Sequence, residues 1–123
     1  KTVCLTSWIT DMAATYPGLD IIALSSLNEG TPVSLIEAQA SGIPIVTTDV
    51  GGVNDVIIAN ETAFLVDKLD MNSFGERLLQ LVEDNELRVK MGQKGFKHVK
   101  SKFDVSILAA NMDRLYSTLL SKK

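Results

Sequence analysis

Short apolar runs rich in β-branched residues alternate along the chain with longer segments in which apolar residues recur every three or four positions. The runs lie at residues 2–6, 19–25, 45–48 and 63–66. Their composition is that of strands, and the nearly continuous apolar character of 19–25 is typical of a parallel strand buried on both faces. The alternation predicts an α/β fold in which helices flank a Rossmann-like parallel sheet.

From Asp70 onwards the spacing of apolar residues predicts two or three consecutive helices that end the chain. Asp84-Asn85 separates the first two of these helices, and Asp104 is suited to cap the last one. The apolar stripes consist of Phe74, Leu78, Leu81 and Val82, then Leu87, Met91, Gly95, Val99 and Phe103, then Val105, Leu108, Met112, Tyr116 and Leu119.

Residues 29–37 carry two glutamates across the junction between a strand and a helix. Glu29 lies in a polar loop, and Glu37 lies about one and a half turns into a helix that opens at Pro32 and runs to Gly42. Two acids placed in this way can hold hydroxyl groups on either side of a phosphate, which suits a nucleotide sugar. The spacing by itself favours a simpler interpretation, a loop acid and an exposed helix acid.

The first turn of this helix is a candidate anion site. The free N–H groups of Val33 and Ser34 point outward there, where a phosphate would be stabilised. Ser34, Glu37 and Ser41 share a polar stripe at spacings of three and four. The residues expected to face the sheet are Leu35, Ile36 and Ala40.

The N-terminal residues before 19–25 contain one cysteine and one tryptophan. Cys4 lies in the first apolar run, which predicts a small core residue. Trp8 either stacks near a nucleobase or covers the end of the sheet, and the second interpretation is favoured because large aromatic side chains are usually well buried. Thr10 or Asp11 is expected to cap a short helix at 12–16.

Two further segments have a weaker link to function. Gly51-Gly52 after a strand is a weak phosphate signal, so we expect it to allow close packing of the helix at 53–58 on the sheet. The helix at 90–102 carries five lysines and His98, which favours a solvated face over a membrane-binding surface. His98 is assigned to that face and not to catalysis.

Composition excludes several classes of protein. A hydrophobic content of 46% and a charged content of 22% are ordinary for a soluble globular chain, and a net charge of −3 argues against nucleic acid as the main partner. One cysteine and one histidine cannot form a structural zinc site. We therefore expect no metal, no membrane span, and a reducing, cytoplasmic compartment, with membrane-peripheral contact as an option.

The order and spacing of several motifs resemble those of the C-terminal domain of group 1 (family-four) retaining glycosyltransferases of the GT-B fold. Nearly the whole chain is covered by the resemblance. The matching motifs are Leu19-Asp20-Ile21-Ile22-Ala23-Leu24-Ser25-Ser26, Glu29-Gly30-Thr31-Pro32 with Glu37-Ala38, Ala40-Ser41-Gly42-Ile43-Pro44-Ile45-Val46, Thr47-Thr48-Asp49-Val50-Gly51-Gly52, Phe64-Leu65-Val66, and Leu87-Arg88 with Met91-Gly92.

The resemblance implies a role for each part of the central motif. Glu37 would hold the ribose hydroxyls of a UDP- or GDP-sugar donor, and Glu29 would lie beside the transferred hexose as the catalytic residue. The backbone of Gly30-Thr31-Pro32-Val33-Ser34 would contact the sugar and the diphosphate. The loop at Trp8-Ile9 would offer backbone groups to the nucleobase, and a saccharide or lipid-linked molecule would be the acceptor.

Some family features have no match in this sequence. Ser7 and Ala63 stand where the family commonly has glycine, which leaves both turns open. Residues 1–123 start at Lys1 and match a donor-binding domain that lacks its first βα units, including the Arg and Lys that would neutralise the diphosphate. The N-terminal Rossmann domain is also expected as a missing partner. We expect these 123 residues alone to be inactive.

Two other functions stay open at this point. A nucleotide-sugar epimerase of the same fold is one, although the pair Glu29 and Glu37 fits the transferases better. A non-catalytic module that binds a nucleotide sugar or another protein is the second. A preceding Rossmann domain with the missing basic residues would distinguish the transferase from the others.

Overall fold

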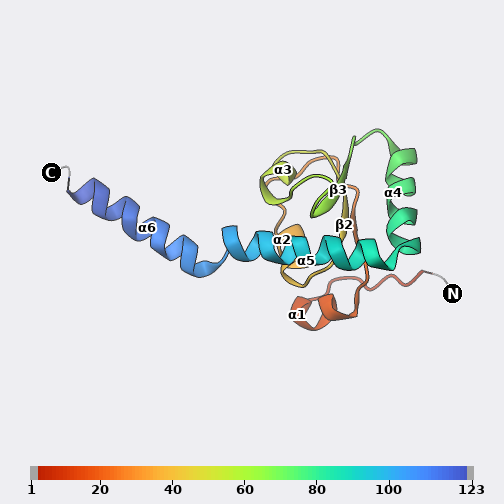
Figure 1. Cartoon of the computed structure of the whole chain (residues 1–123), viewed down its shortest axis with the longest axis horizontal. Helices are drawn as coiled ribbons and strands as arrows, with labels where there is room; N and C mark the ends of the chain where they lie inside the picture. The colour runs from red at the N-terminus through yellow and green to blue at the C-terminus, as the bar shows by residue number, and fades with distance from the viewer. Residues whose placement is uncertain (1–2, 122–123) are drawn as a thin grey trace.

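Three short parallel strands run through the middle of the structure, a computed structural model that describes residues 3–121 (Figure 1). They are β1 (Ile22–Leu24), β2 (Ile45–Thr48) and β3 (Ala63–Val66), hydrogen-bonded in the order β1-β2-β3. Ile45 of β2 is paired with Ile22 on one side and with Ala63 on the other. The parallel sheet with flanking helices that the sequence predicts is therefore confirmed.

Helices cover both faces of this sheet. They are α1 (Met12–Thr15), the 3₁₀ turn η1 (Tyr16–Gly18), α2 (Val33–Ala40), α3 (Val53–Val56), α4 (Met71–Glu83), α5 (Asn85–Lys102) and α6 (Val105–Leu120). In Figure 1, α4 stands on one side of β2 and β3, α2 lies on the other, and α5 runs beneath the body. The long helix α5 packs on both α2 and α4.

The core is divided between the two faces of the sheet because successive side chains on a strand point in opposite directions. Ile45 of β2 packs in a cluster with Leu35 and Ala38 of α2. The next residue, Val46, packs in a second cluster with Phe74 of α4 and Met91 of α5. The strands predicted at 45–48 and 63–66 thus have the alternation that two covered faces require.

Aspartate side chains begin four of the helices. Asp11, Asp70, Asp84 and Asp104 each accept a hydrogen bond from a backbone N–H in the first turn of the helix that follows. Such caps stabilise a helix because its first N–H groups have no partner within it. The caps predicted at Asp11 and Asp104 are confirmed.

The strand predicted at 2–6 is wrong for residues 3–6, which are extended without strand pairing, and Thr2 lies outside the described residues. Leu5 is 93% exposed, and Cys4 is a free, exposed thiol instead of a core residue. The composition of the run is that of a strand, but a strand forms only beside a partner. Within residues 3–121, the edge strand β1 pairs only with β2.

The second predicted strand is shorter than expected. Only Ile22–Leu24 of the run 19–25 forms β1, and Ala23 is exposed, so the prediction of a strand buried on both faces is wrong here. The reason is the position of β1 at the edge of the sheet. The helix predicted at 53–58 likewise ends at Val56, the last residue of α3.

Two details of the predicted helix faces also differ. Pro32 is the N-cap of α2 and not its first helical residue. Ala40, predicted to face the sheet, is exposed, and the buried residues are Leu35, Ala38 and Gln39. On α4, Phe74 and Leu81 are buried as predicted, whereas Val82 at the edge of that stripe is exposed.

The last helix, α6, projects away from the rest of the structure (Figure 1). It contains no buried residue, and its predicted apolar stripe is exposed, including Val105, Leu108 and Leu119. The helix itself is confirmed, but its apolar face is not buried against another part of the described residues. Across residues 3–121, no helix combines the length and hydropathy that a membrane crossing would need.

Candidate functional site

The loop that carries Glu29 leaves the carboxyl end of β1 and is tied to the carboxyl end of β2. The buried Thr48 at the end of β2 donates a hydrogen bond from Oγ1 to the backbone oxygen of Ser26, at 2.6 Å. Ser26 in turn donates from Oγ to Oε1 of Glu29, at 2.6 Å. Glu29 is half-buried, and its carboxylate is therefore fixed to the edge of the sheet.

Gly51 and Gly52 lie directly against the same loop. The N–H of Gly52 donates to the backbone oxygen of Gly30 at 3.0 Å. Gly51 has φ +49°, and a Cβ atom there would overlap the carbonyl oxygen of Glu29; at Gly52 it would overlap that of Gly30. We expected this pair to allow helix–sheet packing, and that prediction is wrong: the glycines let two loops touch at the carboxyl edge.

The turn that holds these glycines is anchored to the third strand. The N–H of Asp49 donates to the backbone oxygen of Val66 at 2.7 Å. Asn54 of α3 donates from Nδ2 to Oδ1 of Asp49 at 2.6 Å. The loop of Glu29 is thus held through a continuous set of contacts from all three strands, which places its backbone rigidly.

The start of α2 follows this loop and is open to solvent. Pro32 is buried, and its carbonyl accepts the N–H of Leu35 at 3.0 Å, which begins the helix. Gly30, Thr31, Val33 and Ser34 are all exposed. Since the first N–H groups of a helix have no intrahelical partner, this stretch offers donors and a positive dipole end to an anion.

Glu37 lies on α2 and is contacted by a tyrosine from outside the sheet. Tyr16 donates from its hydroxyl to Oε2 of Glu37 at 3.0 Å, and the same hydroxyl lies 3.2 Å from the backbone oxygen of Ser34. Burial raises the pKa of Tyr16 to about 12, and the hydrogen bond and the charge of Glu37 add to this shift. The tyrosine therefore stays protonated and remains a donor at neutral pH.

The inner face of α2 fixes the position of Glu37 along the helix. Gln39 is fully buried and donates from Nε2 to the backbone oxygens of Leu35 (3.1 Å) and Val56 (2.8 Å). A Cβ atom on Gly95 of α5 would lie 3.1 Å from Cγ of Gln39, so the two helices approach closely there. Sliding or rotation of α2 would break the buried hydrogen bond from Gln39 to Val56.

Trp8 and Ile9 lie in the extended segment before α1. Trp8 is 88% exposed, so the favoured interpretation that it covers the end of the sheet is wrong. Ile9 is also exposed, and no hydrogen bond within residues 3–121 links either residue to the loop of Glu29 or to Glu37. Ser7 has φ +59°, the left-handed conformation that glycine adopts without strain. At Ala63, by contrast, φ is not positive, and the residue begins β3.

Three residues of this region were missed by sequence reasoning: Tyr16, Ser26 and Thr48. Tyr16 had a detectable signal, because a buried tyrosine usually finds a partner for its hydroxyl. Ser26 and Thr48 had none, since a serine in a polar loop and a threonine in a strand are common everywhere. Their contacts depend on which strand ends lie side by side.

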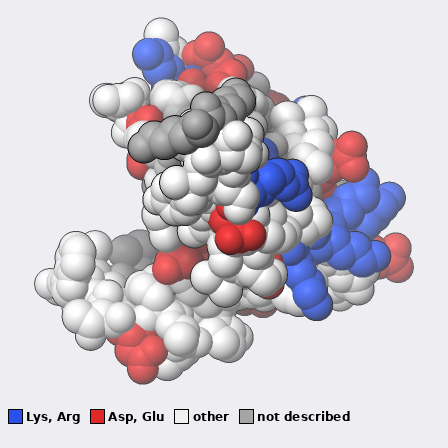
Figure 2. Space-filling view, turned by 90° about the vertical axis from the view of Figure 1, so that its left-hand side faces the viewer, with Lys and Arg blue, Asp and Glu red and all other residues white. Residues whose placement is uncertain are grey.

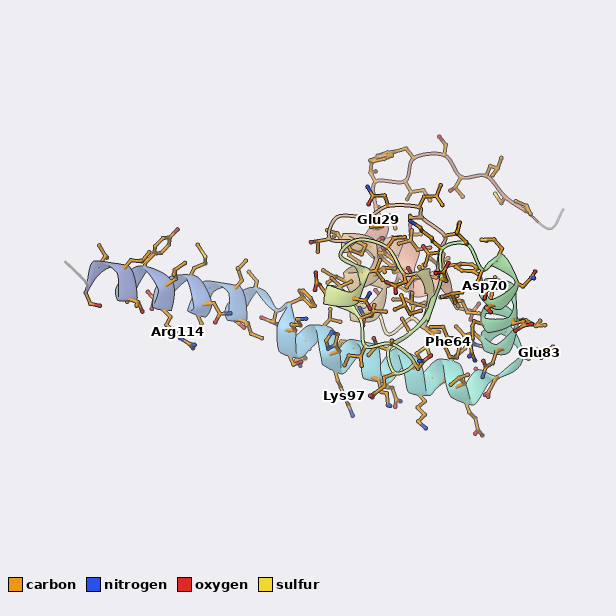
Figure 3. All side chains as sticks on the ribbon, turned by 90° about the horizontal axis from the view of Figure 1, so that it is seen from above. Glu29, Phe64, Asp70, Glu83, Lys97 and Arg114 are labelled. Atoms are coloured by element: carbon orange, nitrogen blue, oxygen red, sulfur yellow. The ribbon has the colours of Figure 1, made fainter. Side chains whose placement is uncertain are left out.

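The basic helix lies away from this edge. The lysines of α5 are exposed, and Figure 2 shows basic side chains gathered along one side of the molecule. Figure 3 places Lys97 and Glu29 on opposite sides of the body. His98 is not on that solvated face as predicted: it is half-buried, with its ring edge-on to Phe103, and burial followed by the charge of Lys102 lowers its pKa.

Comparison with known proteins agrees with this arrangement. The family model described as glycosyl transferases group 1 matches residues 1–98. The capsular polysaccharide biosynthesis glycosyltransferase CapM of Staphylococcus aureus is 32% identical over 120 residues, which are 98% of this chain and 32% of that protein. Sucrose-phosphate synthase from Thermosynechococcus elongatus superposes with a TM-score of 0.83 at 27% identity, covering 91% of this chain and 28% of the other.

A third similar protein is known with a ligand. Anabaena HepE, solved in complex with UDP-glucose, superposes with a TM-score of 0.81 at 18% identity, over 90% of this chain and 31% of HepE. The chain thus spans about a third of each of these three proteins. The neighbouring structures have the GT-B fold, and the predicted likeness to its C-terminal domain is confirmed.

Proposed function

The chain belongs to the glycosyl transferases group 1 family, and we propose that it is the donor-binding part of a retaining hexosyltransferase. The donor is a UDP- or GDP-sugar, and the acceptor is a saccharide or a lipid-linked saccharide. Since the chain spans about a third of its relatives, the acceptor and the rest of the catalytic groups are assigned to another part of the protein.

The observation that carries this proposal is the arrangement of two acids around an open helix start. Glu29 is fixed at the carboxyl edge of the sheet by Ser26, and Glu37 is contacted by Tyr16. The exposed residues Gly30, Thr31, Val33 and Ser34 lie between them along the chain. Ligands of open parallel sheets bind outside the carboxyl ends of the strands, which is where this loop lies.

Each part of the arrangement matches one part of a nucleotide sugar. Glu37 accepts hydrogen bonds from the ribose hydroxyls, and the N–H groups at the start of α2 face the diphosphate. Glu29 lies beside the transferred hexose, where its charge stabilises the positive charge that develops on the sugar ring in the transition state. The nucleobase lies towards Trp8 and Ile9. No metal takes part in this scheme.

The relatives support the class of substrates. CapM is named for capsular polysaccharide biosynthesis, which favours a saccharide acceptor. HepE was solved with UDP-glucose, so the fold that the two chains share accommodates a nucleotide sugar. We place the reaction in the cytoplasm, at the membrane surface if the acceptor is lipid-linked.

The test is the variant Glu37→Ala in the full-length protein, with Glu76→Ala on the exposed face of α4 as the matched control. Removal of a charged acceptor from two ribose hydroxyls weakens binding of the cognate nucleotide diphosphate by about 1.5–3 kcal/mol. Titration calorimetry with UDP and GDP measures this loss, and the control variant keeps the affinity of the wild type. Unchanged affinity in Glu37→Ala for the cognate nucleotide removes Glu37 from the site and contradicts the proposal.

A further inference from the structure

We propose that Tyr16 is a positioning residue whose hydroxyl group holds the Glu37 carboxylate in place, so that the site prefers a ribonucleotide to its dideoxy counterpart. The proposal rests on the function proposed above, in which Glu37 binds ribose. It assigns a role to a residue outside the central motif, on a turn that comes before the sheet.

The geometry of the pair is specific to one oxygen of the carboxylate. The hydroxyl of Tyr16 donates to Oε2 of Glu37 at 3.0 Å. Within residues 3–121 this is the one hydrogen bond made by the Glu37 carboxylate, whose side chain is otherwise exposed on α2. A free glutamate side chain populates many rotamers, and a buried donor removes most of that freedom.

Tyr16 itself has little freedom. Its side chain is 4% exposed and packs in the core cluster with Leu35 and Ala38 of α2. The turn η1 closes with a hydrogen bond from the N–H of Leu19 to the backbone oxygen of Tyr16, at 3.0 Å. The hydroxyl position is therefore set by the core and not by the ligand.

The contact also joins two parts of the chain that have no other such link. Among the side-chain hydrogen bonds of the described residues, those of the Tyr16 hydroxyl are the ones that connect residues 11–18 to α2. Asp11 caps the helix that precedes the tyrosine, and its bond stays within that turn. The position of the Glu37 carboxylate relative to the N-terminal segment is thus set by one phenol hydroxyl group.

The arrangement leaves free acceptors for a diol. A carboxylate has about four lone-pair sites on its two oxygens, and Tyr16 occupies one of them. The other oxygen, Oε1, and the remaining lone pair of Oε2 have no hydrogen-bond partner within residues 3–121 and can accept two hydroxyl groups together. The 2′ and 3′ hydroxyls of ribose are adjacent and suit such a pair of acceptors.

The hydroxyl of Tyr16 stays protonated and is therefore always available as a hydrogen-bond donor. Burial, then the hydrogen bond and charge of Glu37, raise the pKa of Tyr16 to about 12. The phenol therefore keeps its proton over the whole range in which nucleotide binding is measured. A phenylalanine fills the same volume without the donor, which makes Tyr16→Phe the informative change.

The experiment uses Tyr16→Phe in the full-length protein and titrates it with UDP, GDP and their 2′,3′-dideoxy forms. We expect the affinity for the cognate ribonucleotide to fall about three- to tenfold, while that for the dideoxy form stays within about twofold of the wild type. The matched control is Tyr116→Phe, because Tyr116 is the second tyrosine of the chain and is 56% exposed on α6. Thermal unfolding of each variant shows whether the fold is kept.

The variant Glu37→Ala separates this proposal from the function on which it rests. If Glu37→Ala lowers ribonucleotide affinity and Tyr16→Phe does not, Tyr16 only packs and the positioning role is wrong. An equal loss of affinity for the ribo and dideoxy forms in Tyr16→Phe also overturns it, because the effect then does not depend on the 2′ and 3′ hydroxyls of the ribose. If Glu37→Ala leaves ribonucleotide affinity unchanged, the ribose-binding role of Glu37 is itself wrong. In support of the proposal, Tyr16→Phe adds no further loss in the Glu37→Ala background.

Discussion

The two glutamates of the central motif are held in different ways, although they are eight positions apart in the sequence. Glu29 lies on a loop whose backbone is trapped between strand ends and the Gly51-Gly52 turn. Glu37 lies on a helix, and a side chain from a distant turn contacts its carboxylate. Main-chain contacts set the position of the Glu29 backbone, and one hydroxyl group sets that of the Glu37 carboxylate.

This difference matters for the roles assigned to the two acids. A group next to a reacting centre gains from a rigid backbone, since a shift of one ångström can remove much of its effect. A group that binds ribose acts through the hydrogen bonds that its carboxylate accepts, so losing the donor that holds this carboxylate weakens affinity. The comparison therefore predicts that changes at the loop reduce turnover, and that changes near Glu37 reduce affinity.

The largest effect is expected from Gly51→Ala or Gly52→Ala. Either Cβ atom would overlap a backbone oxygen of the Glu29 loop, and Gly51 also has a positive φ. The loop has to move, so we expect turnover to fall by more than about 10²-fold, together with a loss of stability of about 2–4 kcal/mol. Steady-state kinetics and chemical denaturation of the full-length protein measure both.

The chain provides a control for these glycine variants. A Cβ atom on Gly75, within α4, would meet nothing within 4 Å. Gly75→Ala is expected to stabilise the helix by about 0.5–1 kcal/mol and to leave turnover unchanged. Normal turnover in Gly51→Ala would show that the loop adapts, and that the Glu29 backbone is not rigid.

A smaller effect is expected from Glu29→Gln. The amide keeps the size of the side chain and removes its charge, so we expect turnover to fall by about 10- to 100-fold while nucleotide affinity changes by less than about twofold. Transfer assays and calorimetry on the same preparation give the two values. If affinity fell as much as kcat/KM, the assignment of the two acids would be wrong.

The fold was predictable from the sequence wherever an element packs against neighbours that the pattern itself indicates. The strands at 45–48 and 63–66 lie side by side and are covered on both faces, so their apolar residues are buried, Leu65 only partly. The run at 2–6 has a similar composition, but residues 3–6 have no strand beside them. Composition therefore predicts which segments can form strands, and pairing decides which of them do.

Residues within the predicted helices show the same limit. We expected Leu35, Ile36 and Ala40 to form the face of α2 that packs on the sheet. Ala40 is exposed, however, and the polar residue Gln39 of this helix is fully buried. It is tolerated in the core because its amide nitrogen donates to Leu35 and Val56. A preference for apolar residues at inward positions cannot anticipate a buried amide whose second partner lies 17 residues away.

The candidate site was predictable in its residues but not in its supports. The pair Glu29 and Glu37 and the open helix start follow from the motif. The hydroxyl of Tyr16 and the Gly51-Gly52 turn come from segments about 21 residues away on either side, and only the fold brings them together. No local spacing rule relates such positions, because their distance depends on the crossover connections of the sheet.

The smallest effect, and the one that sharpens the comparison most, is expected from Ser26→Ala. Ser26 is to Glu29 what Tyr16 is to Glu37, a hydroxyl donor to one carboxylate oxygen, at 2.6 Å. The backbone of Ser26 is separately held by Thr48, so the loop keeps its place when the hydroxyl is removed. We therefore expect turnover to fall only about three- to fivefold, with nucleotide affinity unchanged, since a single hydrogen bond to a charged group is lost and the backbone contacts stay.

The adjacent Ser25→Ala is the matched control, because Ser25 is exposed and makes no side-chain hydrogen bond within residues 3–121. Single-turnover transfer rates and calorimetry for Ser25→Ala, Ser26→Ala and Tyr16→Phe test the comparison directly. Tyr16→Phe is expected to change affinity, and Ser26→Ala the rate. The same pattern in both variants would mean that the two acids act on one part of the donor. In that case the different supports of Glu29 and Glu37 would reflect only the fold, because a loop beside a strand end is held by backbone and a helix side chain is not.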